Sequence, residues 1–196
     1  MEQGTDNGTR DETLIARALE GDRPAFSALI RRYEDTVYRF AFKVCRNREK
    51  AEETLQDTFV NVYRKLDTFD GKSKFSTWLY SIVTNNCLMK RRRTRMQDSL
   101  DSLNESPSGG TDIRSWDETP VEKLLTQELR GQLDAAILKL PIEYRIVFVL
   151  RDIEGKTAEE TAQILGISVE ATKSRLRRAR AFLRTRLNAY MVTHHG

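Results

Sequence analysis

The residues best suited to bind a charged partner are two dense groups of bases. The first group holds Lys90, Arg91, Arg92, Arg93 and Arg95, and the second runs from Lys173 to Arg186 with seven bases and no acid. Ammonium and guanidinium groups bind phosphate oxygens, so clustered bases indicate contact with a polyanion. The whole chain of 196 residues has a formal net charge of only +4, which places the positive charge in two local patches.

Three aromatic residues, Phe75, Trp78 and Tyr80, lie one or more helical turns before the first basic group. An aromatic ring can stack on an unpaired base, and nearby bases can hold the backbone phosphates of the same strand. Trp78 also has the shape to wedge against a base pair. The alternative is that Phe75, Tyr80 and part of Trp78 belong to a hydrophobic core.

Catalytic groups are not apparent in the sequence. The two histidines, His194 and His195, lie at the extreme carboxyl end, and no nucleophile has a base at a recognisable spacing. The two cysteines, Cys45 and Cys87, show no Cys-x-x-Cys pattern and are expected to be buried free thiols in a reducing compartment. We therefore predict no enzymatic activity, no cofactor and no metal.

The elements that position these groups are predicted to be helices. Apolar residues recur at helical spacing through most of the chain, and no segment alternates as a strand. Gly21 is expected to end a short first helix, and Asp22 and Asn47 are expected to cap the next two. A fourth helix should start near Ser76 and run through Trp78 into the first basic group.

The composition changes between Gln97 and Thr119, where Ser, Gly and acidic residues dominate and a single base occurs. Such a segment predicts a flexible acidic linker, although a surface loop within one domain is the alternative. The fold class is thus all-α, with two small helical domains joined by this linker. The predicted boundaries are residues 12–95 for the first domain, 96–120 for the linker and 121–190 for the second domain.

The second basic group belongs to a helix-turn-helix pattern. Thr157 and Glu160 predict a capping box at the start of a short helix, and Gly166 is expected to end it. Ile167 is expected to be a buried plug in the turn. Ser168 can cap a longer basic helix, whose inner stripe is Thr172, Leu176, Ala179, Leu183 and Leu187. The first residues of such a helix reach base edges in the major groove, while later bases neutralise phosphates. A solvated amphipathic helix is the alternative, and the combined pattern favours DNA binding.

These segments together resemble an extracytoplasmic-function sigma factor, the smallest class of the bacterial sigma-70 superfamily. The resemblance covers residues 14–187. In the first half it rests on Gly21-Asp22, the run from Ala51 to Val60 and the run from Phe75 to Tyr80. In the second half it rests on Leu140-Pro141, Glu154-Gly155 and the run from Thr172 to Arg180.

The resemblance implies that the first domain is sigma region two, which binds the polymerase clamp and opens the minus-ten element. It implies that the second domain is sigma region four, which reads the minus-thirty-five element. The polymerase contacts it implies are Glu53, Gln56, Asp57 and Asn61. The minus-ten contacts it implies are Phe69, Lys72, Phe75, Trp78, Asn85, Lys90, Arg91, Arg92 and Arg93. The minus-thirty-five contacts it implies are Ser168, Glu170, Ala171, Lys173, Ser174, Arg175, Arg177 and Arg178.

The resulting interpretation is an RNA polymerase sigma factor that binds core RNA polymerase and promoter DNA and initiates transcription. Membership of this class also implies an anti-sigma factor as a partner. Because no apolar run is long enough to cross a bilayer and the amino terminus has no signal core, we expect a cytoplasmic protein without membrane insertion. The alternative is a helix-turn-helix regulator that is not a sigma subunit, but it leaves the Trp78 segment unexplained.

Overall fold

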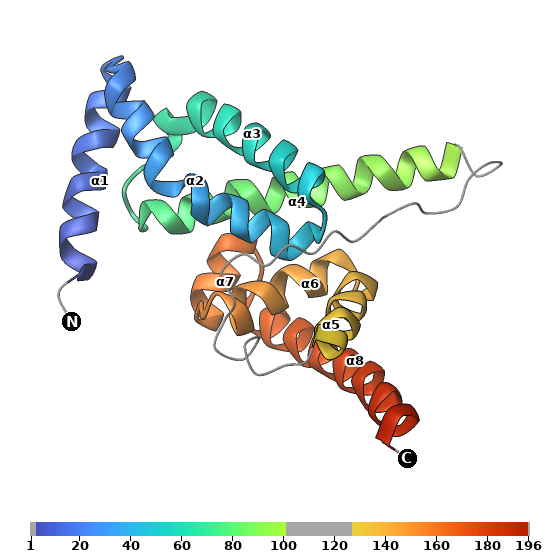
Figure 1. Ribbon diagram of the computed structural model, residues 1–196. Helices are drawn as coiled ribbons and strands as arrows, with labels where there is room; N and C mark the ends of the chain where they lie inside the picture. Colours follow the sequence, from blue (N-terminus) through green and yellow to red (C-terminus); the bar gives the residue numbers. More distant parts are fainter. Residues whose placement is uncertain (1–2, 101–126, 196) are drawn as a thin grey trace.

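The computed structural model describes residues 3–100 and 127–195, and every regular element within these ranges is helical (Figure 1). The first domain contains α1 (Gln3–Leu19), α2 (Arg23–Cys45), α3 (Arg48–Lys65), the short 3-10 helix η1 (Leu66–Thr68) and α4 (Phe75–Leu100). The second domain contains α5 (Gln127–Lys139), α6 (Ile142–Phe148), the π-helical turn η3 (Val149–Ile153), α7 (Ala158–Leu165) and α8 (Val169–His195). The predicted all-α fold is confirmed.

The starts of α2 and α3 follow from local hydrogen bonding. The carboxylate of Asp22 accepts a hydrogen bond from the backbone N–H of Ala25 at 3.0 Å. The amide oxygen of Asn47 accepts one from the backbone N–H of Lys50 at 2.8 Å. These bonds satisfy N–H groups that have no partner in the first turn of a helix, so both capping predictions are confirmed.

A reciprocal capping box begins α7, as the sequence predicts. The Thr157 hydroxyl accepts from the Glu160 N–H at 3.1 Å, and the Glu160 carboxylate accepts from the Thr157 N–H at 2.7 Å. Gly166 ends the helix with a φ of 62°, a left-handed conformation that favours glycine. This turn sets the direction in which α8 leaves the motif.

Replacing the capping threonine should weaken the second domain without touching its core. Thr157→Ala removes one acceptor of the capping box, and we expect the free energy of unfolding to fall by about 1 kcal/mol. Thr157→Ser keeps the hydroxyl and should retain most of the stability. Urea denaturation followed by circular dichroism measures both, and equal stability of the two variants would contradict a role for the cap.

The core of the first domain lies where α2, α3 and α4 meet. Phe40 of α2 and Val83 of α4 are almost completely buried there. α3 contributes two fully buried threonines, whose polarity is accommodated within the helix itself. The Thr54 hydroxyl donates to the Lys50 carbonyl at 2.7 Å, and the Thr58 hydroxyl donates to the Thr54 carbonyl at 2.6 Å. Because each hydroxyl is satisfied, burying it carries little penalty.

The second domain packs α5 against α8 around Ile137, Leu140 and Ala179. Of the predicted inner stripe of α8, Thr172, Leu176, Ala179 and Leu183 are buried, whereas Leu187 is half-buried. The prediction that Ile167 is a buried plug is wrong, because its side chain is only half-buried. The buried residues of α7 are Ala158, Thr161, Ala162 and Ile164, and Ile164 belongs to the hydrophobic cluster that also contains residues of the first domain.

The predicted boundaries around the linker differ from the structure. α4 begins at Phe75 and continues to Leu100, so the first five residues of the predicted linker, 96–100, are helical. Arg95, Met96 and Gln97 favour a helix, and no Gly or Pro interrupts this stretch. Residues 101–120 of the predicted linker and residues 121–126 of the predicted second domain lie outside the described residues. The first helix is also longer than expected, since α1 already starts at Gln3.

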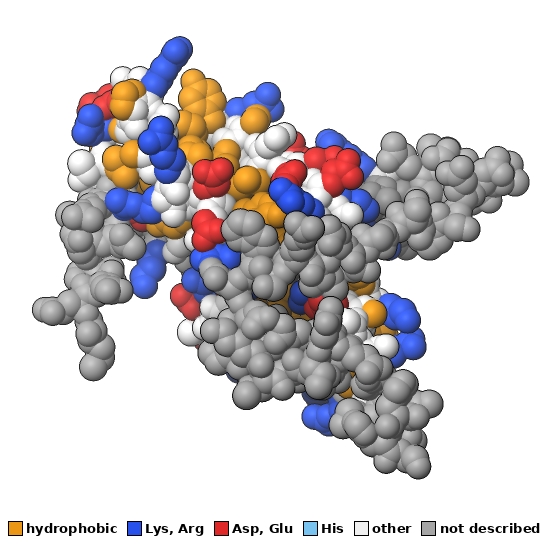
Figure 2. Space-filling view, in the orientation of Figure 1, with side chains coloured by type: hydrophobic (Ala, Val, Ile, Leu, Met, Phe, Trp, Pro, Cys, Tyr) orange, Lys and Arg blue, Asp and Glu red, His pale blue; other side chains and the backbone are white. Residues whose placement is uncertain are grey.

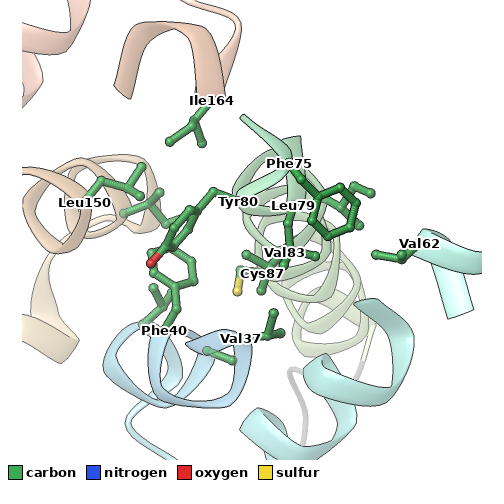
Figure 3. Close-up of a cluster of buried hydrophobic side chains, with 14 of the residues drawn as sticks. Val37, Phe40, Val62, Phe75, Leu79, Tyr80, Val83, Cys87, Leu150 and Ile164 are labelled. Atoms are coloured by element: carbon green, nitrogen blue, oxygen red, sulfur yellow. The ribbon is translucent and has the colours of Figure 1, made fainter. Parts of the chain in front are cut away.

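The two domains pack directly on each other, with α6 and α7 lying against α2 and α4 (Figure 1). Leu150 and Ile164 of the second domain are buried in the same hydrophobic cluster as Phe40 and Tyr80 of the first. Figure 3 shows the Tyr80 ring between Phe40, Leu150 and Ile164. The sequence predicts two linked domains but not this shared core.

Both cysteines are free thiols, as expected, with Cys87 buried and Cys45 half-buried. A hydrogen bond with the Cys87 thiol is the main cause that lowers the pKa of Cys45 to about 7. A hydrogen bond with Thr54 and the positive charges of Arg145 and Lys90 act in the same direction, against the effect of burial. The pKa of Cys87 is raised well above its usual value by the same hydrogen bond and by burial.

This difference in pKa between the two thiols predicts that Cys45 is alkylated selectively. The thiolate is the reactive form, so the reaction of Cys45 with iodoacetamide should rise steeply as the pH increases through about 7, while Cys87 stays unreactive. Cys87→Ala removes the main hydrogen bond and should move the rise in Cys45 alkylation to higher pH. Peptide mass spectrometry after timed alkylation measures both sites. Equal reactivity of the two thiols across this pH range would contradict the prediction.

Candidate polymerase and DNA interfaces

One face of α3 presents the acidic and polar residues that the sequence predicts for polymerase binding. Glu53, Gln56 and Asp57 are exposed and lie three and four positions apart, which places them on the same side of the helix. Figure 2 shows acidic and hydrophobic side chains exposed over the region that α3 occupies in Figure 1. A face of this kind suits a basic surface on another protein.

Lys90 belongs to this acidic face, although the sequence places it among the DNA contacts. Its ammonium nitrogen lies 3.1 Å from a carboxylate oxygen of Glu53 and 3.1 Å from one of Asp57. The side chain is 24% exposed. Lys90 therefore partly neutralises the carboxylates in this conformation, whereas Arg91, Arg92 and Arg93 are exposed to solvent.

Asn61 is half-buried at the edge of the same face and links α3 to α4. Its amide nitrogen donates to the amide oxygen of Asn86 at 2.9 Å. The amide nitrogen of Asn86 donates in turn to the Thr58 hydroxyl at 3.0 Å. This chain of hydrogen bonds holds the acidic face at a defined position on α4.

The sequence interpretation missed two apolar residues on α3. Val60 is 49% exposed and Tyr63 is 71% exposed, and they follow Gln56 at spacings of four and seven residues. The Tyr63 ring meets Phe26 edge to face, with 5.3 Å between ring centroids. The sequence could have indicated Val60 and Tyr63, because both are apolar residues outside the inner stripe of α3 that packs into the core.

An aromatic group formed by Phe69, Phe75 and Trp78 lies at the start of α4. Each pair of rings has a centroid separation of 5.5 Å. Phe75 is only 5% exposed, and its ring also meets Tyr33 at 5.2 Å. The predicted DNA contact by Phe75 is therefore not available in this conformation, because the ring is part of the core. Trp78 is half-buried and keeps an accessible surface.

Tyr80 is also a core residue, with 6% exposure. The core interpretation thus holds for Phe75 and Tyr80, and Phe75 acts as the support on which Phe69 and Trp78 rest. Phe69 is half-buried beside them. Of the three aromatic residues singled out in the sequence, Trp78 alone retains a surface for a base.

The loop before α4 is shaped by Asp70, Gly71 and Lys72. The Asp70 carboxylate accepts from the Lys72 N–H at 3.1 Å and forms an ion pair with the Lys72 ammonium at 2.8 Å. The hydrogen bond with Asp70 raises the pKa of Lys72, and Lys72 in turn lowers the pKa of Asp70. Gly71 supplies a φ of 69° at the turn. Lys72 stays exposed and charged beside the aromatic group.

One side of α4 connects this aromatic group with the first basic group. Asn85 is exposed and follows Trp78 by seven residues, and Arg92 follows Asn85 by seven more. Residues at this spacing lie on nearly the same side of a helix, with about 10 Å between successive positions. The side of α4 that carries Trp78, Asn85 and Arg92 can therefore follow one nucleic-acid strand.

The amino-terminal end of α8 presents the residues predicted to contact the minus-thirty-five element. The Ser168 hydroxyl accepts from the Ala171 N–H at 3.1 Å and caps the helix, as predicted. Glu170, Lys173 and Arg177 are exposed. Ala171, Ser174 and Arg175 are half-buried at the edge of this surface.

Two arginines of α8 also bind other parts of the second domain. Arg178 donates to the Tyr144 hydroxyl at 3.1 Å. Arg180 forms two hydrogen bonds with the Asp152 carboxylate, at 2.9 and 2.6 Å. Arg180 therefore stabilises the packing of α8 on η3, while Arg177 points its charge to the outer surface.

Within residues 3–100 and 127–195, no group of three or more His, Cys, Asp or Glu side chains is placed to hold a metal ion. None of the helices in these ranges has the length and apolar character needed to cross a bilayer.

Comparison with known proteins defines the class. Residues 29–96 match sigma-70 region 2, and residues 130–183 match sigma-70 region 4. A helical protein with these two regions is a transcription factor of the sigma-70 type. The chain belongs to the extracytoplasmic-function (ECF) RNA polymerase sigma factors, as the following relatives show.

ECF RNA polymerase sigma factor SigW of Bacillus subtilis is 34% identical over 176 residues, which cover 88% of this chain and 94% of that protein. The ECF RNA polymerase sigma-E factor of Haemophilus influenzae is 31% identical over 185 residues, covering 92% and 97%. The structure of CnrH in complex with the cytosolic domain of CnrY matches 92% of this chain and 98% of that chain, with a TM-score of 0.63 and 26% identity. The family predicted from the sequence is confirmed.

Proposed function

We propose that this sigma factor divides promoter recognition among three separate surfaces. The acidic face of α3 binds the polymerase clamp, the Trp78 side of α4 captures the opened minus-ten strand, and the start of α8 reads the minus-thirty-five element. The observation that carries the proposal is that exposed members of the three predicted groups lie on three different helices, α3, α4 and α8.

Polymerase binding rests on charge complementarity and apolar contact. Glu53, Gln56 and Asp57 supply acidic and polar groups, and Val60 and Tyr63 extend the same face with exposed apolar surface. A tyrosine that becomes buried when two proteins bind is a frequent source of binding energy at the centre of their interface, where polar residues surround it. We infer that Val60 and Tyr63 join the polymerase contacts.

Strand opening must be driven by binding energy. Unstacking and extruding a base costs a few kcal/mol, and stacking a base on an aromatic side chain returns about 1–3 kcal/mol. Trp78 offers such a surface, backed by Phe69 and Phe75 at 5.5 Å. Asn85 and Arg92 lie farther along the same side of α4 and would hold the captured strand.

Minus-thirty-five recognition is assigned to the exposed residues at the start of α8. Glu170 and Lys173 lie in the first turns, where side chains of a recognition helix reach base edges. Arg177 lies farther along and is suited to a base or a phosphate.

The test of this function is transcription in vitro with core RNA polymerase. A template is chosen by mapping transcripts that appear after expression of the protein in its host. Core enzyme with this protein should initiate at a defined start site, and core enzyme alone should not. A helix-turn-helix regulator that is not a sigma subunit could not make core enzyme initiate, so failure here would overturn the proposal.

Three further assignments rest on membership of the ECF class. We propose that the protein acts in the cytoplasm with RNA polymerase, and that it catalyses no reaction of its own. We also propose an anti-sigma factor as a partner. The solved sigma factor RpoE of Bartonella quintana, which shares this fold with a TM-score of 0.66 and 22% identity, is in complex with the anti-sigma factor NepR.

Arg177 and Arg180, three positions apart on α8, are expected to have different roles. Arg177→Ala should weaken binding of polymerase holoenzyme to the upstream element by about 1–3 kcal/mol if Arg177 contacts a base, or should reduce the salt dependence of binding if it contacts a phosphate. Arg180→Ala breaks the pair with Asp152 and should lower the stability of the domain more than it lowers DNA binding. Salt titrations of promoter binding and urea denaturation distinguish the two. Identical effects of both variants would contradict this division.

A further inference from the structure

Met89 of α4 is a large apolar residue that is open to solvent. Its side chain is 49% exposed, and it belongs to neither of the two hydrophobic clusters among the described residues. The residue before it, Leu88, packs against the core, and the residue after it, Lys90, forms ion pairs with α3. Successive residues of a helix point about 100° apart, so neither the core nor the pairing with α3 occupies Met89.

Met89 lies on the side of α4 that carries Trp78 and Asn85. It follows Trp78 by eleven residues, which is roughly three turns plus about 20°, and it follows Asn85 by four. The three residues therefore lie along one line of the helix, with about 16 Å between the positions of Trp78 and Met89. A nucleic-acid strand with about 3.4 Å per nucleotide covers this distance in about five nucleotides.

The residues that follow Met89 carry positive charge. Arg91, Arg92 and Arg93 are exposed, and the first acid after Met89 in the sequence is Asp98. A single exposed apolar residue needs no explanation on an ordinary surface. Among arginines that suit phosphates, however, the partner expected at Met89 is a nucleic acid, and the apolar contact must come from a base.

Thymine offers a base edge that suits a methionine. Its 5-methyl group lies in the major groove, where apolar side chains contact it. The thioether side chain of methionine is flexible and polarizable, and it adapts to a small apolar group of this kind. The other base edges in the groove present hydrogen-bonding groups, which a thioether satisfies poorly.

We propose that Met89 is a specificity-determining residue that reads thymine beside the captured base, through contact between its thioether and the thymine 5-methyl group. The proposal rests on the function proposed above, since it adds a base preference to the same side of α4. The arginines of this side bind phosphates and position the strand, but phosphate contacts carry no direct sequence information. Burying one methyl group changes an equilibrium constant by about three- to fourfold, which is the expected preference for thymine over uracil.

Promoters that carry deoxyuridine in place of single thymines test this contact, because uracil lacks only the methyl group. Thymine or uracil is placed at each position of the opened segment and of about ten base pairs beside it, first on one strand and then on the other. Polymerase holoenzyme with the wild-type chain should bind thymine about three- to fourfold more tightly than uracil at one position. Met89→Gln should bind both templates equally, whereas Met89→Leu should keep most of the preference.

The controls separate the base contact from other effects of the substitution. Leu19→Gln makes the same apolar-to-polar change on α1, where Leu19 is 50% exposed, and it should keep the wild-type preference. Glutamine can itself pair with adenine, so Met89→Ala is measured beside Met89→Gln. Circular dichroism checks the fold of each variant, and their binding to core polymerase should equal that of wild type.

Two failures are distinguishable in this experiment. If core polymerase with the wild-type chain does not initiate transcription, the proposed function fails. If it initiates but no position on either strand distinguishes thymine from uracil, the role of Met89 is overturned. The role is also overturned if Met89→Gln and Met89→Ala retain the preference of wild type.

Protection from oxidation locates the contact without any substitution. Hydrogen peroxide transfers one oxygen atom to the Met89 sulfur, which becomes a sulfoxide, while the peroxide is reduced to water. In the holoenzyme, oxidation of Met89 should slow when the promoter with thymine at the sensitive position is added, as measured by peptide mass spectrometry. Unchanged oxidation would overturn the proposal. Equal protection by core polymerase alone would make Met89 a protein contact and would overturn it as well.

Discussion

Trp78→Ala is expected to reduce open-complex formation on duplex promoters by about 10- to 100-fold, which corresponds to the loss of one stacking contact of about 1–3 kcal/mol. Binding of the variant to core polymerase should stay normal, because the exposed residues of α3 are unaffected. A promoter that is already unpaired at the minus-ten element should restore most of the activity, because the costly step has been carried out beforehand. Permanganate footprinting of unpaired thymines measures the opening directly.

The position of Trp78 calls for a second variant. Its ring rests on Phe69 and Phe75, so alanine also removes packing from a half-buried site. Trp78→Phe keeps an aromatic ring in this group but presents a smaller stacking surface, and it should show a milder loss of opening with little loss of stability. If both variants fold and open duplex promoters normally, Trp78 has no role in opening. If alanine unfolds the domain while phenylalanine behaves as wild type, Trp78 is a core residue.

Asp57→Arg is expected to weaken binding to core polymerase by about 30-fold or more, since losing one partner of a charged contact at an interface costs about 2–5 kcal/mol. The variant replaces a carboxylate that lies 3.1 Å from the Lys90 ammonium, so it also places two positive charges side by side on the predicted polymerase-binding face. Asp57 is exposed, and the fold should remain intact. Binding of labelled sigma factor to core enzyme measures the effect, with circular dichroism as the check on folding.

Asp35→Arg is the control for the charge reversal at Asp57. Asp35 is exposed on α2, where it pairs with Arg39 one turn later in the same helix. The same change of charge at this position should leave polymerase binding within about twofold of wild type, because exposed pairs of this kind contribute little. Equal loss of binding in both variants would show that net charge, rather than the α3 face, governs the association.

The helices and their ends were predictable from the sequence because their causes are local. The Asp22 and Asn47 caps, the capping box at Thr157 and the glycine turn at Gly166 each depend on residues within a few positions of one another. The inner stripe of α8 was predictable for the same reason, since helical periodicity separates a buried side from an exposed basic side.

The positions of the candidate site residues were predictable only in part. Glu53, Gln56 and Asp57 on α3 and Lys173 and Arg177 on α8 are exposed where the helical pattern predicts. Phase along a helix does not decide how deeply an aromatic ring is buried at a junction of helices. For this reason Phe75 was included among the predicted DNA contacts, whereas in the structure its ring packs against Tyr33 and Phe69.

By itself, then, the sequence determined the all-α fold, the helix caps, the helix-turn-helix and the sigma-factor family. Only the tertiary structure decided the partners of the long charged side chains. Lys90 meets Glu53 across 37 positions, Arg180 meets Asp152 across 28, and Lys43 meets Glu154 across 111. Flexible side chains bearing one charge have many possible partners in a chain rich in both signs, and the packing of α6 and α7 on α2 and α4 selects among them.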